Sequence, residues 1–415
     1  MKYLTNKNNC FITNIFLLMY LFGFLVEGFS KIKNIGLYGA ILFFIVDIFM
    51  NKNEMIKFYK QIYINNKFLI NIFIFFILFV FFRCLFPFSN RDLALHAFKT
   101  EFLNNFIFFI MSIFYLRKIK YLISFFIISF FIFVIKYGYG YYIIYHLNFS
   151  NRLERNFVDY FEFFLPMMII SFFYIKNKLL KITLSIVLIV SLFEFILTGA
   201  RGAWGTIIVD IFLMFMFVFI YKHNYRKKIV FVFTSILIIV SVFFIYLYNN
   251  SDDIKYKIKQ GFNPNGRICI IEDRLPIFLK NGNSFIGIGG VDSAQYIEFL
   301  NKYNAPKRYG VWNNGQFRYS SDEPFLLNMF YKYGILGLGL FLVFSLCLFK
   351  NIIKAFIYEN NYLLFGLGIA FFGYFFVGGL FEGRGLKYLV IYFALYLIIK
   401  DNYEYSLYIS RKTTS

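Results

Sequence analysis

The chain has 415 residues, of which 60% are hydrophobic and 24% aromatic, and its mean hydropathy is +0.64. Soluble domains average about half apolar residues and lack repeated apolar stretches of about 18 residues, so this composition excludes an ordinary soluble protein and predicts an integral membrane protein. The formal net charge of +21 would suit a nucleic-acid-binding protein, but the positions of the charges favour a different explanation.

Apolar runs near bilayer length recur along the whole chain and predict about twelve transmembrane helices in an all-α, polytopic helical bundle. The runs are continuous, without the alternation of polar and apolar residues that a transmembrane β-barrel requires. No convincing cleavage site follows the first run, so it is expected to remain as a helix rather than leave as a signal peptide. The runs lie at 11–29, 35–50, 69–86, 102–116, 121–138, 157–175, 179–198, 204–221, 229–248, 325–349, 362–380 and 386–400.

The loops between these runs predict the orientation of the chain. If the N-terminus is cytoplasmic, the loops on the cytoplasmic side are rich in lysine and arginine, and only Glu54 and Glu359 oppose them. Loops on the other side mix both signs of charge, which is the positive-inside pattern of membrane proteins. Both termini are then cytoplasmic, and the pattern explains much of the net charge without nucleic acid. The basic residues on the cytoplasmic side are Lys52, Lys57, Lys60, Lys67, Arg117, Lys118, Lys120, Lys176, Lys178, Lys181, Lys222, Arg226, Lys227, Lys228, Lys350 and Lys354.

One polar segment, residues 249–323, is much longer than the others and separates the ninth predicted helix from the tenth on the external side. Long loops in compact proteins carry function or are disordered, and the semi-apolar stretch Ile268–Leu279 favours a partly helical, ordered loop. The predicted organisation is therefore nine transmembrane helices over 1–248, this large loop over 249–323, three transmembrane helices over 324–400 and a cytoplasmic tail over 401–415.

The segment Leu197–Gly205 holds one arginine, Arg201, between glycines, with a long apolar run on each side. A guanidinium placed where the chain enters or leaves a bilayer is costly unless it meets an anion or the interface. Arg201 is therefore a candidate for binding a phosphate-bearing lipid. An interfacial anchor that snorkels to the headgroups explains this segment equally well.

Three further arginines, Arg267, Arg274 and Arg384, fall with Arg201 on or beside the external face in this topology. The arginine fork stays charged and matches phosphate oxygens, so the set together favours a site for a diphosphate headgroup. For any single member, an interfacial anchor or a local salt bridge, such as Arg384 with Glu382, is the simpler explanation.

Asp322 and Glu323 close the long loop, directly before Pro324 and the tenth predicted helix. An acidic pair followed by a proline in the first turn is typical of a capped helix start. The alternative is a carboxylate at the membrane surface that acts as general base on a sugar hydroxyl. The sequence leaves both interpretations open.

The remaining signals are weaker. The four cysteines and three histidines are scattered, which gives no disulfide framework and no zinc or histidine-rich metal motif, so neither metal nor cofactor is expected. No serine–histidine–acid set and no Walker-type loop is present, which disfavours hydrolase and ATP-driven functions. Gly334, Gly337 and Gly339 in the tenth helix are expected to allow close helix packing, and 287–290 to form a turn.

The Leu197–Gly205 segment resembles the T-x-S-R-G-A-W signature of the bacterial O-antigen ligase family, membrane glycosyltransferases related to O-antigen polymerases, with Ala200 in the serine position. Further segments resemble the family's arginine at the start of a loop helix, its G-x-G turn, the helix after the loop and the polar turn before the last helix. These are Arg267 with Ile271, Phe285–Gly289, Phe325–Leu340 and Gly379–Glu382 with Arg384, and weaker similarity extends to Arg91–Asn104 and Arg152–Pro166.

One position departs from the family pattern. The family places a histidine eleven residues before the glycine that corresponds to Gly334, and here that position is Glu323. If that histidine is the family's catalytic base, this chain uses Glu323 or Asp322 in its place, or carries out a variant reaction.

The resemblance implies transfer of a glycan from undecaprenyl diphosphate to lipid A–core oligosaccharide, at the periplasmic face of the bacterial inner membrane. Arg201 and Arg267 would bind the diphosphate, Arg274 or Arg384 would support them, and Glu323 would be the base in a metal-independent, inverting reaction. The implied partners are the two lipid-linked substrates and membrane lipid, with no nucleic acid.

Two other functions stay open. An O-antigen polymerase would use the same donor with a second lipid-linked glycan as acceptor, and the missing histidine favours it. A lipid-linked sugar flippase or transporter is less favoured, because transporters bury charges near the bilayer midplane and show repeated halves. Asp47, Glu194 and Asp210 are the few acids inside the apolar runs, and no internal repeat is evident.

Overall fold

A computed structural model of the chain describes residues 7–26, 28–116, 118–146, 157–172, 174–222, 224, 226–259, 267–307, 310–313, 316–319, 324–380 and 383–413. Within these ranges nearly all regular structure is helical, with one two-stranded antiparallel sheet. The elements are α1 (Lys7–Leu25), α2 (Ser30–Leu85), α3 (Arg91–Phe98), η1 (Lys99–Leu103), α4 (Asn104–Tyr115), α5 (Ile119–His146), α6 (Phe157–Ser171), α7 (Lys178–Leu197), α8 (Arg201–Tyr221), α9 (Arg226–Asn250), α10 (Asp252–Lys259), α11 (Arg267–Asn281), α12 (Ala294–Lys302), β1 (Gly310–Asn313), β2 (Gln316–Tyr319), α13 (Phe325–Glu359), α14 (Tyr362–Phe372), η3 (Gly373–Val377), η4 (Gly378–Leu380) and α15 (Lys387–Thr413).

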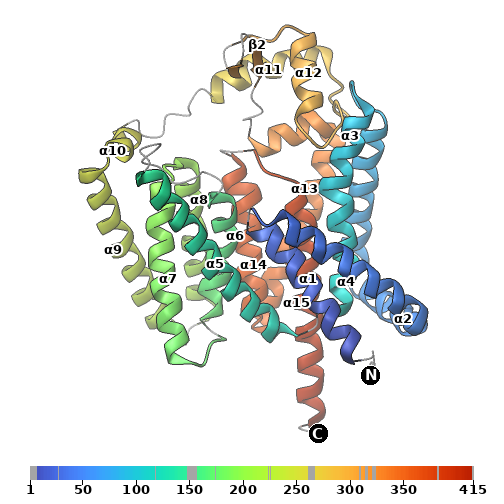
Figure 1. Cartoon of the computed structure of the whole chain (residues 1–415), viewed down its shortest axis with the longest axis vertical. Helices are drawn as coiled ribbons and strands as arrows, with labels where there is room; N and C mark the ends of the chain where they lie inside the picture. The colour runs from blue at the N-terminus through green and yellow to red at the C-terminus, as the bar shows by residue number, and fades with distance from the viewer. Residues whose placement is uncertain are drawn as a thin grey trace.

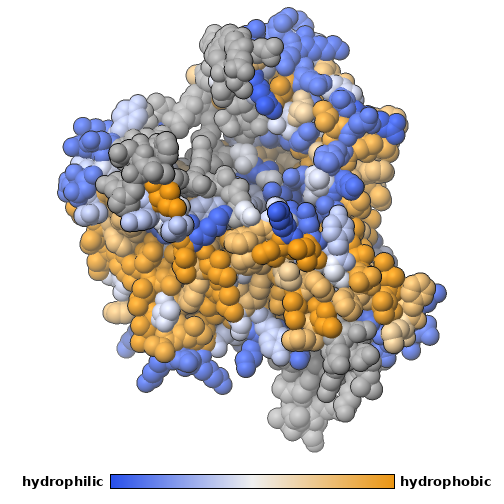
Figure 2. Space-filling view, viewed as in Figure 1, coloured by the Kyte–Doolittle hydropathy of each residue, from blue (hydrophilic) through white to orange (hydrophobic). Residues whose placement is uncertain are grey.

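The predicted all-α, polytopic class is confirmed. In the described part of the chain, seven helices are long and apolar enough to cross a membrane, and the apolar helices Phe11–Leu25 and Thr234–Asn250 are shorter. Helices suit this environment because each satisfies its own backbone hydrogen bonds where no water is present. Figure 2 shows an apolar band across the middle of the molecule, with hydrophilic residues at both ends. The number of crossings, about twelve, stays a prediction.

The predicted loop between the second and third apolar runs is wrong, because both runs and the stretch between them form the single element α2. The backbone leaves helical geometry at Asn51 and Asn66, which divide α2 into three parts. Between these breaks Met55, Phe58 and Ile62 are buried, while the lysines are exposed. A helix with one buried apolar face and a basic exposed face is typical of the membrane interface, so this stretch folds as a helix instead of an open loop.

The C-terminal helices α14 and α15 supply the centre of the bundle. Residues 389–399 of α15 are at most 2% exposed. The ring of Phe393 lies 4.6 Å from that of Phe73, 5.4 Å from that of Phe109 and 5.1 Å from that of Phe344, measured between centroids. Aromatic pairs at such separations add to the burial of their area, and they join α15 to α2, α4 and α13.

The long polar segment forms a small folded unit at one end of the bundle (Figure 1). Its described part contains α10, α11, α12 and the hairpin β1–β2, in which Trp312 pairs with Phe317. We call 267–319 the loop subdomain. It has a separate apolar core that includes Phe278, Tyr296 and Phe299 and continues onto the first turns of α13. The helices agree with the expected partly helical loop, whereas the hairpin is not among the predicted elements.

The loop subdomain joins α13 where that helix is interrupted. Gly334 has φ 66° and ψ −168°, so helical hydrogen bonding stops and backbone groups on both sides become available. The 284–289 segment binds them, with Ile288 N donating to Tyr331 O, Gly289 N to Lys332 O, Ile335 N to Ser284 O and Leu336 N to Phe285 O. The expected role of Gly334 in helix–helix packing is therefore corrected, because its close neighbour is the turn of the loop subdomain.

Gly334→Ala is expected to destabilise this junction. A Cβ at Gly334 would lie 2.3 Å from the carbonyl carbon and oxygen of Phe285, and the backbone conformation is one that only glycine adopts without strain. Backbone strain alone costs about 1–3 kcal/mol, which lowers the thermal unfolding midpoint. Gly339→Ala is the matched control in the same helix, because a Cβ there meets nothing within 4 Å. Equal midpoints for the two variants would contradict the assignment.

Candidate functional site

The predicted site residues whose side chains the structure describes, Arg201, Arg274 and Arg384, lie toward the end of the bundle that carries the loop subdomain. Figure 1 shows both chain termini at the opposite end. Because α9 ends at this end, beside α10, the preceding antiparallel helix α8 starts here with Arg201. Arg384 precedes α15, which runs from this end to the C-terminus, so Arg384 lies here as well. We call this the loop end of the bundle.

Arg201 is the first residue of α8 and follows a sharp turn. Gly199 has a φ of 64°, a left-handed conformation that glycine adopts readily. It lets the chain reverse direction in the three residues between the end of α7 and the start of α8. Thr198 Oγ1 donates to Phe195 O at 2.7 Å and accepts from Ala200 N at 3.3 Å, which fixes the turn on both sides. The side chain of Arg201 is partly exposed.

Several hydrogen-bond donors meet at the start of α8. Ala200 occupies the N-cap position and provides no side-chain hydrogen bond to the first-turn amides. The indole N–H of Trp204, one turn along, is buried and has no hydrogen-bond partner among the described residues. The N-terminus of a helix attracts anions through its unpaired amides and its dipole, and Arg201 adds a full positive charge there. Because alanine has no side-chain oxygen, the N-cap residue itself makes no hydrogen bond to these amides.

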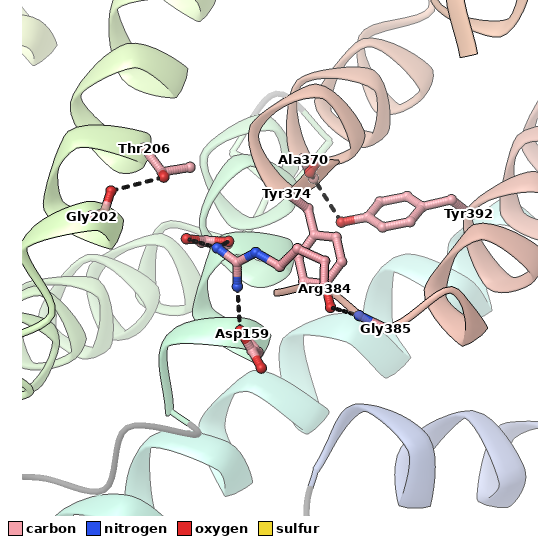
Figure 3. Close-up of polar contacts among 9 residues, drawn as sticks. Asp159, Gly202, Thr206, Ala370, Tyr374, Arg384, Gly385 and Tyr392 are labelled. Carbon is pink, nitrogen blue, oxygen red and sulfur yellow. Dashed lines mark hydrogen bonds and ion pairs between the residues drawn. The ribbon is translucent and has the colours of Figure 1, made fainter. Parts of the chain in front are cut away.

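Arg384 lies in a buried ion-pair cluster at the loop end (Figure 3). Its guanidinium pairs with Asp159 through Nη1 and with Glu162 through Nη2, the latter at 2.7 Å. The side chains of Arg384 and Glu162 are fully buried, whereas Asp159 is 40% exposed. The guanidinium also lies 4.7 Å from the ring centre of Tyr374. In this arrangement the charge of Arg384 is already matched by α6, so it fits a supporting role better than direct binding of a diphosphate.

The backbone of η4 packs closely on the ion pair between Arg384 and Glu162. A Cβ at Gly378 would lie 2.2 Å from Nη2 of Arg384 and 3.2 Å from Glu162 Oε2. Glycine at this position allows η4 to pack directly on the ion pair. The neighbouring residue, Gly379, packs against Phe325, the first residue of α13. The ion-pair cluster and the start of α13 therefore lie on the same short segment of backbone.

Arg384→Met is expected to lower the free energy of unfolding by about 3–5 kcal/mol, because it leaves the buried carboxylate of Glu162 without its cation. Combining it with Glu162→Gln should restore part of the loss, since the uncompensated charge is removed as well. Thermal or denaturant unfolding of the two single variants and the double variant measures the coupling. Strictly additive effects would show that the pair does not act as a unit.

Arg274 is a buried member of the loop subdomain, only 1% exposed. Its guanidinium carbon lies 6.0 Å from the ring centre of Tyr296 and 5.6 Å from that of Tyr319. Burial raises the pKa of Tyr319, and the charge of Arg274 opposes that shift. Arg267 begins the same helix, α11, but its side chain lies outside the described residues. The structure thus places Arg274 inside the subdomain and leaves the direction of the Arg267 side chain a prediction.

The two candidate bases, Asp322 and Glu323, lie outside the described residues. The helix that follows them begins at Phe325, with Pro324 at the N-cap position. The predicted placement of this proline in the first helical turn is therefore shifted by one residue. Pro324 leads into α13, whose first residue, Phe325, packs against Gly379 of η4.

Sequence reasoning missed the partners of Arg384. Asp159 and Glu162 are spaced three residues apart at the start of α6, which places both on one face of a helix. That spacing, ahead of an apolar run, was the available signal. Glu162 and Arg384 are 222 residues apart along the chain, so the sequence does not indicate that they pair.

Taken together, the fold and the site define a polytopic helical membrane protein with clustered charges and uncapped helix donors at one end of its bundle. The family model described as O-Antigen ligase matches residues 186–342, from within α7 to the middle of α13, so this part of the chain is similar to O-antigen ligases. Among curated protein sequences, none matches the chain. Members of the family are membrane glycosyltransferase-like enzymes, ligases and polymerases, that act on lipid-linked glycans and lipopolysaccharide.

Proposed function

We propose that the chain is an O-antigen ligase-type glycosyltransferase. It transfers a glycan from undecaprenyl diphosphate to lipid A–core oligosaccharide, at the periplasmic face of the bacterial inner membrane, with both termini in the cytoplasm. The observation that carries the proposal is Arg201 at the uncapped start of α8, inside the matched segment and at the loop end of the bundle. A negatively charged headgroup embedded at the membrane surface is the ligand that this arrangement suits.

The chemistry follows from the donor. The acceptor hydroxyl attacks the anomeric carbon, the bond from that carbon to the diphosphate oxygen breaks, and undecaprenyl diphosphate leaves with the electron pair. Attack opposite the leaving group inverts the anomeric configuration. Arg201, with Arg267, stabilises the charge that develops on the departing diphosphate, and Glu323 or Asp322 takes the proton of the acceptor hydroxyl. Because the leaving group is already activated, the reaction requires neither metal nor nucleotide hydrolysis.

The supporting residues have different tasks in this scheme. Arg384 is held by Asp159 and Glu162 and fixes the segment between η4 and α15 against α6. Arg274 packs between two tyrosine rings and stabilises the loop subdomain. Both arginines therefore act by positioning the loop end in which the diphosphate binds.

An O-antigen polymerase is the second candidate, because the departure from the family's histidine concerns the group that meets the acceptor. Purified protein supplied with undecaprenyl-diphosphate glycan and lipid A–core distinguishes the two. Ligase activity joins glycan to core, whereas polymerase activity lengthens the lipid-linked glycan and leaves core unused. Movement of intact donor across vesicles without any new glycosidic bond would instead identify a transporter and overturn the proposal.

A further inference from the structure

Asp210 is a buried carboxylate that the proposed reaction does not use. It lies on α8, in the same helix as Arg201 but more than two turns further into the bundle, and it is 0% exposed. Neither of its carboxylate oxygens has a hydrogen-bond partner among the described residues. An ionised carboxylate without donors in a dry, apolar interior is strongly unfavourable, so the side chain requires a compensating positive charge or a proton.

The positive charge that interacts with Asp210 is already paired with other acids. Asp210 interacts electrostatically with Arg384 and with Glu162, one attractive and one repulsive partner. Arg384, however, forms its ion pairs with Asp159 and Glu162. With all groups ionised, the Arg384 guanidinium would interact with Asp159, Glu162 and Asp210 together. Because two acids already neutralise that guanidinium, a charge on Asp210 would add an unpaired negative charge beside Glu162.

On the side of η3 there is no room for a side chain beside Asp210. A Cβ at Gly373 would lie 2.2 Å and 2.3 Å from the two Asp210 oxygens, so the backbone of η3 lies directly on the carboxyl group. Gly373 begins a π-helical turn, a local widening of a helix that is frequent at functional sites. Tyr392 of α15 faces the same acids, and its hydroxyl donates to Ala370 O at 3.1 Å. No group of three or more acidic, histidine or cysteine side chains among the described residues could hold a metal ion.

We propose that Asp210 and Glu162 form a buried proton-binding site, in which Asp210 carries the proton and Glu162 stays ionised against Arg384. A proton is the cation that fits, because it needs only one carboxyl oxygen and no additional space. The site is independent of the transferase reaction proposed above, since it rests on the burial and pairing of these three residues alone.

Proton loss from Asp210 would act on Arg384. A third carboxylate would then compete with Asp159 and Glu162 for the guanidinium and weaken the contact between α6 and the segment that precedes α15. Since η4 packs on this ion pair and on the start of α13, the loop end would loosen as the pH rises. Because the folded protein would bind a proton at this site that the unfolded chain releases, folding stability should fall with increasing pH.

Infrared difference spectroscopy on the full-length protein in lipid nanodiscs tests the site directly. Wild-type protein carrying isotope-labelled aspartate is compared at neutral and alkaline pH. We expect a protonated-carboxyl C=O band at neutral pH that shifts with the label, disappears at alkaline pH and is absent from Asp210→Asn. The same band should survive in Asp47→Asn, which alters another fully buried aspartate, one that accepts a hydrogen bond from Tyr115.

Thermal unfolding gives a second readout. The midpoint of wild type should fall between neutral and alkaline pH by more than that of Asp210→Asn, because asparagine imitates the neutral acid at every pH. Absence of any label-sensitive carboxyl band in wild type overturns the proposal, even if the variant does not fold. A band that persists unchanged in Asp210→Asn overturns it equally.

Discussion

Arg201→Ala is expected to reduce glycan transfer by about 10²–10³-fold, the effect of removing one donor from a site that stabilises developing negative charge. Arg201 supplies the only full charge at the start of α8, where the N-cap Ala200 provides no side-chain hydrogen bond. Arg201→Lys should recover part of the rate, since an ammonium keeps the charge but loses the two-pronged contact with phosphate oxygens. Transfer from undecaprenyl-diphosphate glycan to the acceptor, measured as initial rate, gives both values.

An arginine at the other end of the bundle serves as the control. Arg226 begins α9, and its guanidinium donates to Phe219 O at 2.9 Å, away from the loop end. Arg226→Ala should leave transfer at the wild-type rate. Wild-type transfer by Arg201→Ala would refute the assignment of Arg201 to the diphosphate and leave it as an interfacial anchor.

Glu323→Gln is expected to reduce transfer by about 10²–10⁴-fold while donor binding is kept, because the amide preserves size and polarity but cannot accept the proton of the acceptor hydroxyl. Stability is measured beside activity. Binding of the lipid-linked donor, in the absence of acceptor, separates a chemical defect from a folding defect.

Asp322→Asn is the matched variant at the adjacent position. If Glu323 is the base, Asp322→Asn should keep most of the activity, whereas the reverse pattern assigns the base to Asp322. Should both variants transfer glycan at the wild-type rate, the acidic pair only closes the loop before α13, and the proton leaves by another route.

The helices themselves could be predicted well, because apolar runs near bilayer length have few alternatives in lipid. The error at α2 has a specific cause. Its middle stretch combines three lysines with Met55, Phe58 and Ile62, so hydropathy alone gives a polar loop. The buried spacing of those three side chains shows an amphipathic helix, which hydropathy averaged over a window does not reveal.

The candidate site was harder to predict than the fold. The position of Arg201 at a helix start could be predicted from its flanking glycines and apolar runs. The pairing of Arg384 with Asp159 and Glu162 could not be predicted, because more than two hundred residues separate the partners. From the sequence alone, other acidic residues were equally good candidates to pair with Arg384. The junction at Gly334 was likewise hidden, since a glycine in an apolar run normally indicates helix packing.

The sequence by itself determined the membrane class, the helical architecture, the position of the long polar segment and the family resemblance, because hydropathy, charge bias and short motifs are local properties of the chain. Only the tertiary structure decided which charges meet. Burial of Arg384, Glu162 and Asp210 in one cluster depends on how α6, α8, η3 and α15 pack. The neighbours of an ionisable side chain in space determine whether it forms an ion pair, shares a partner with another group or binds a proton. In a low-dielectric interior those neighbours therefore determine its chemistry.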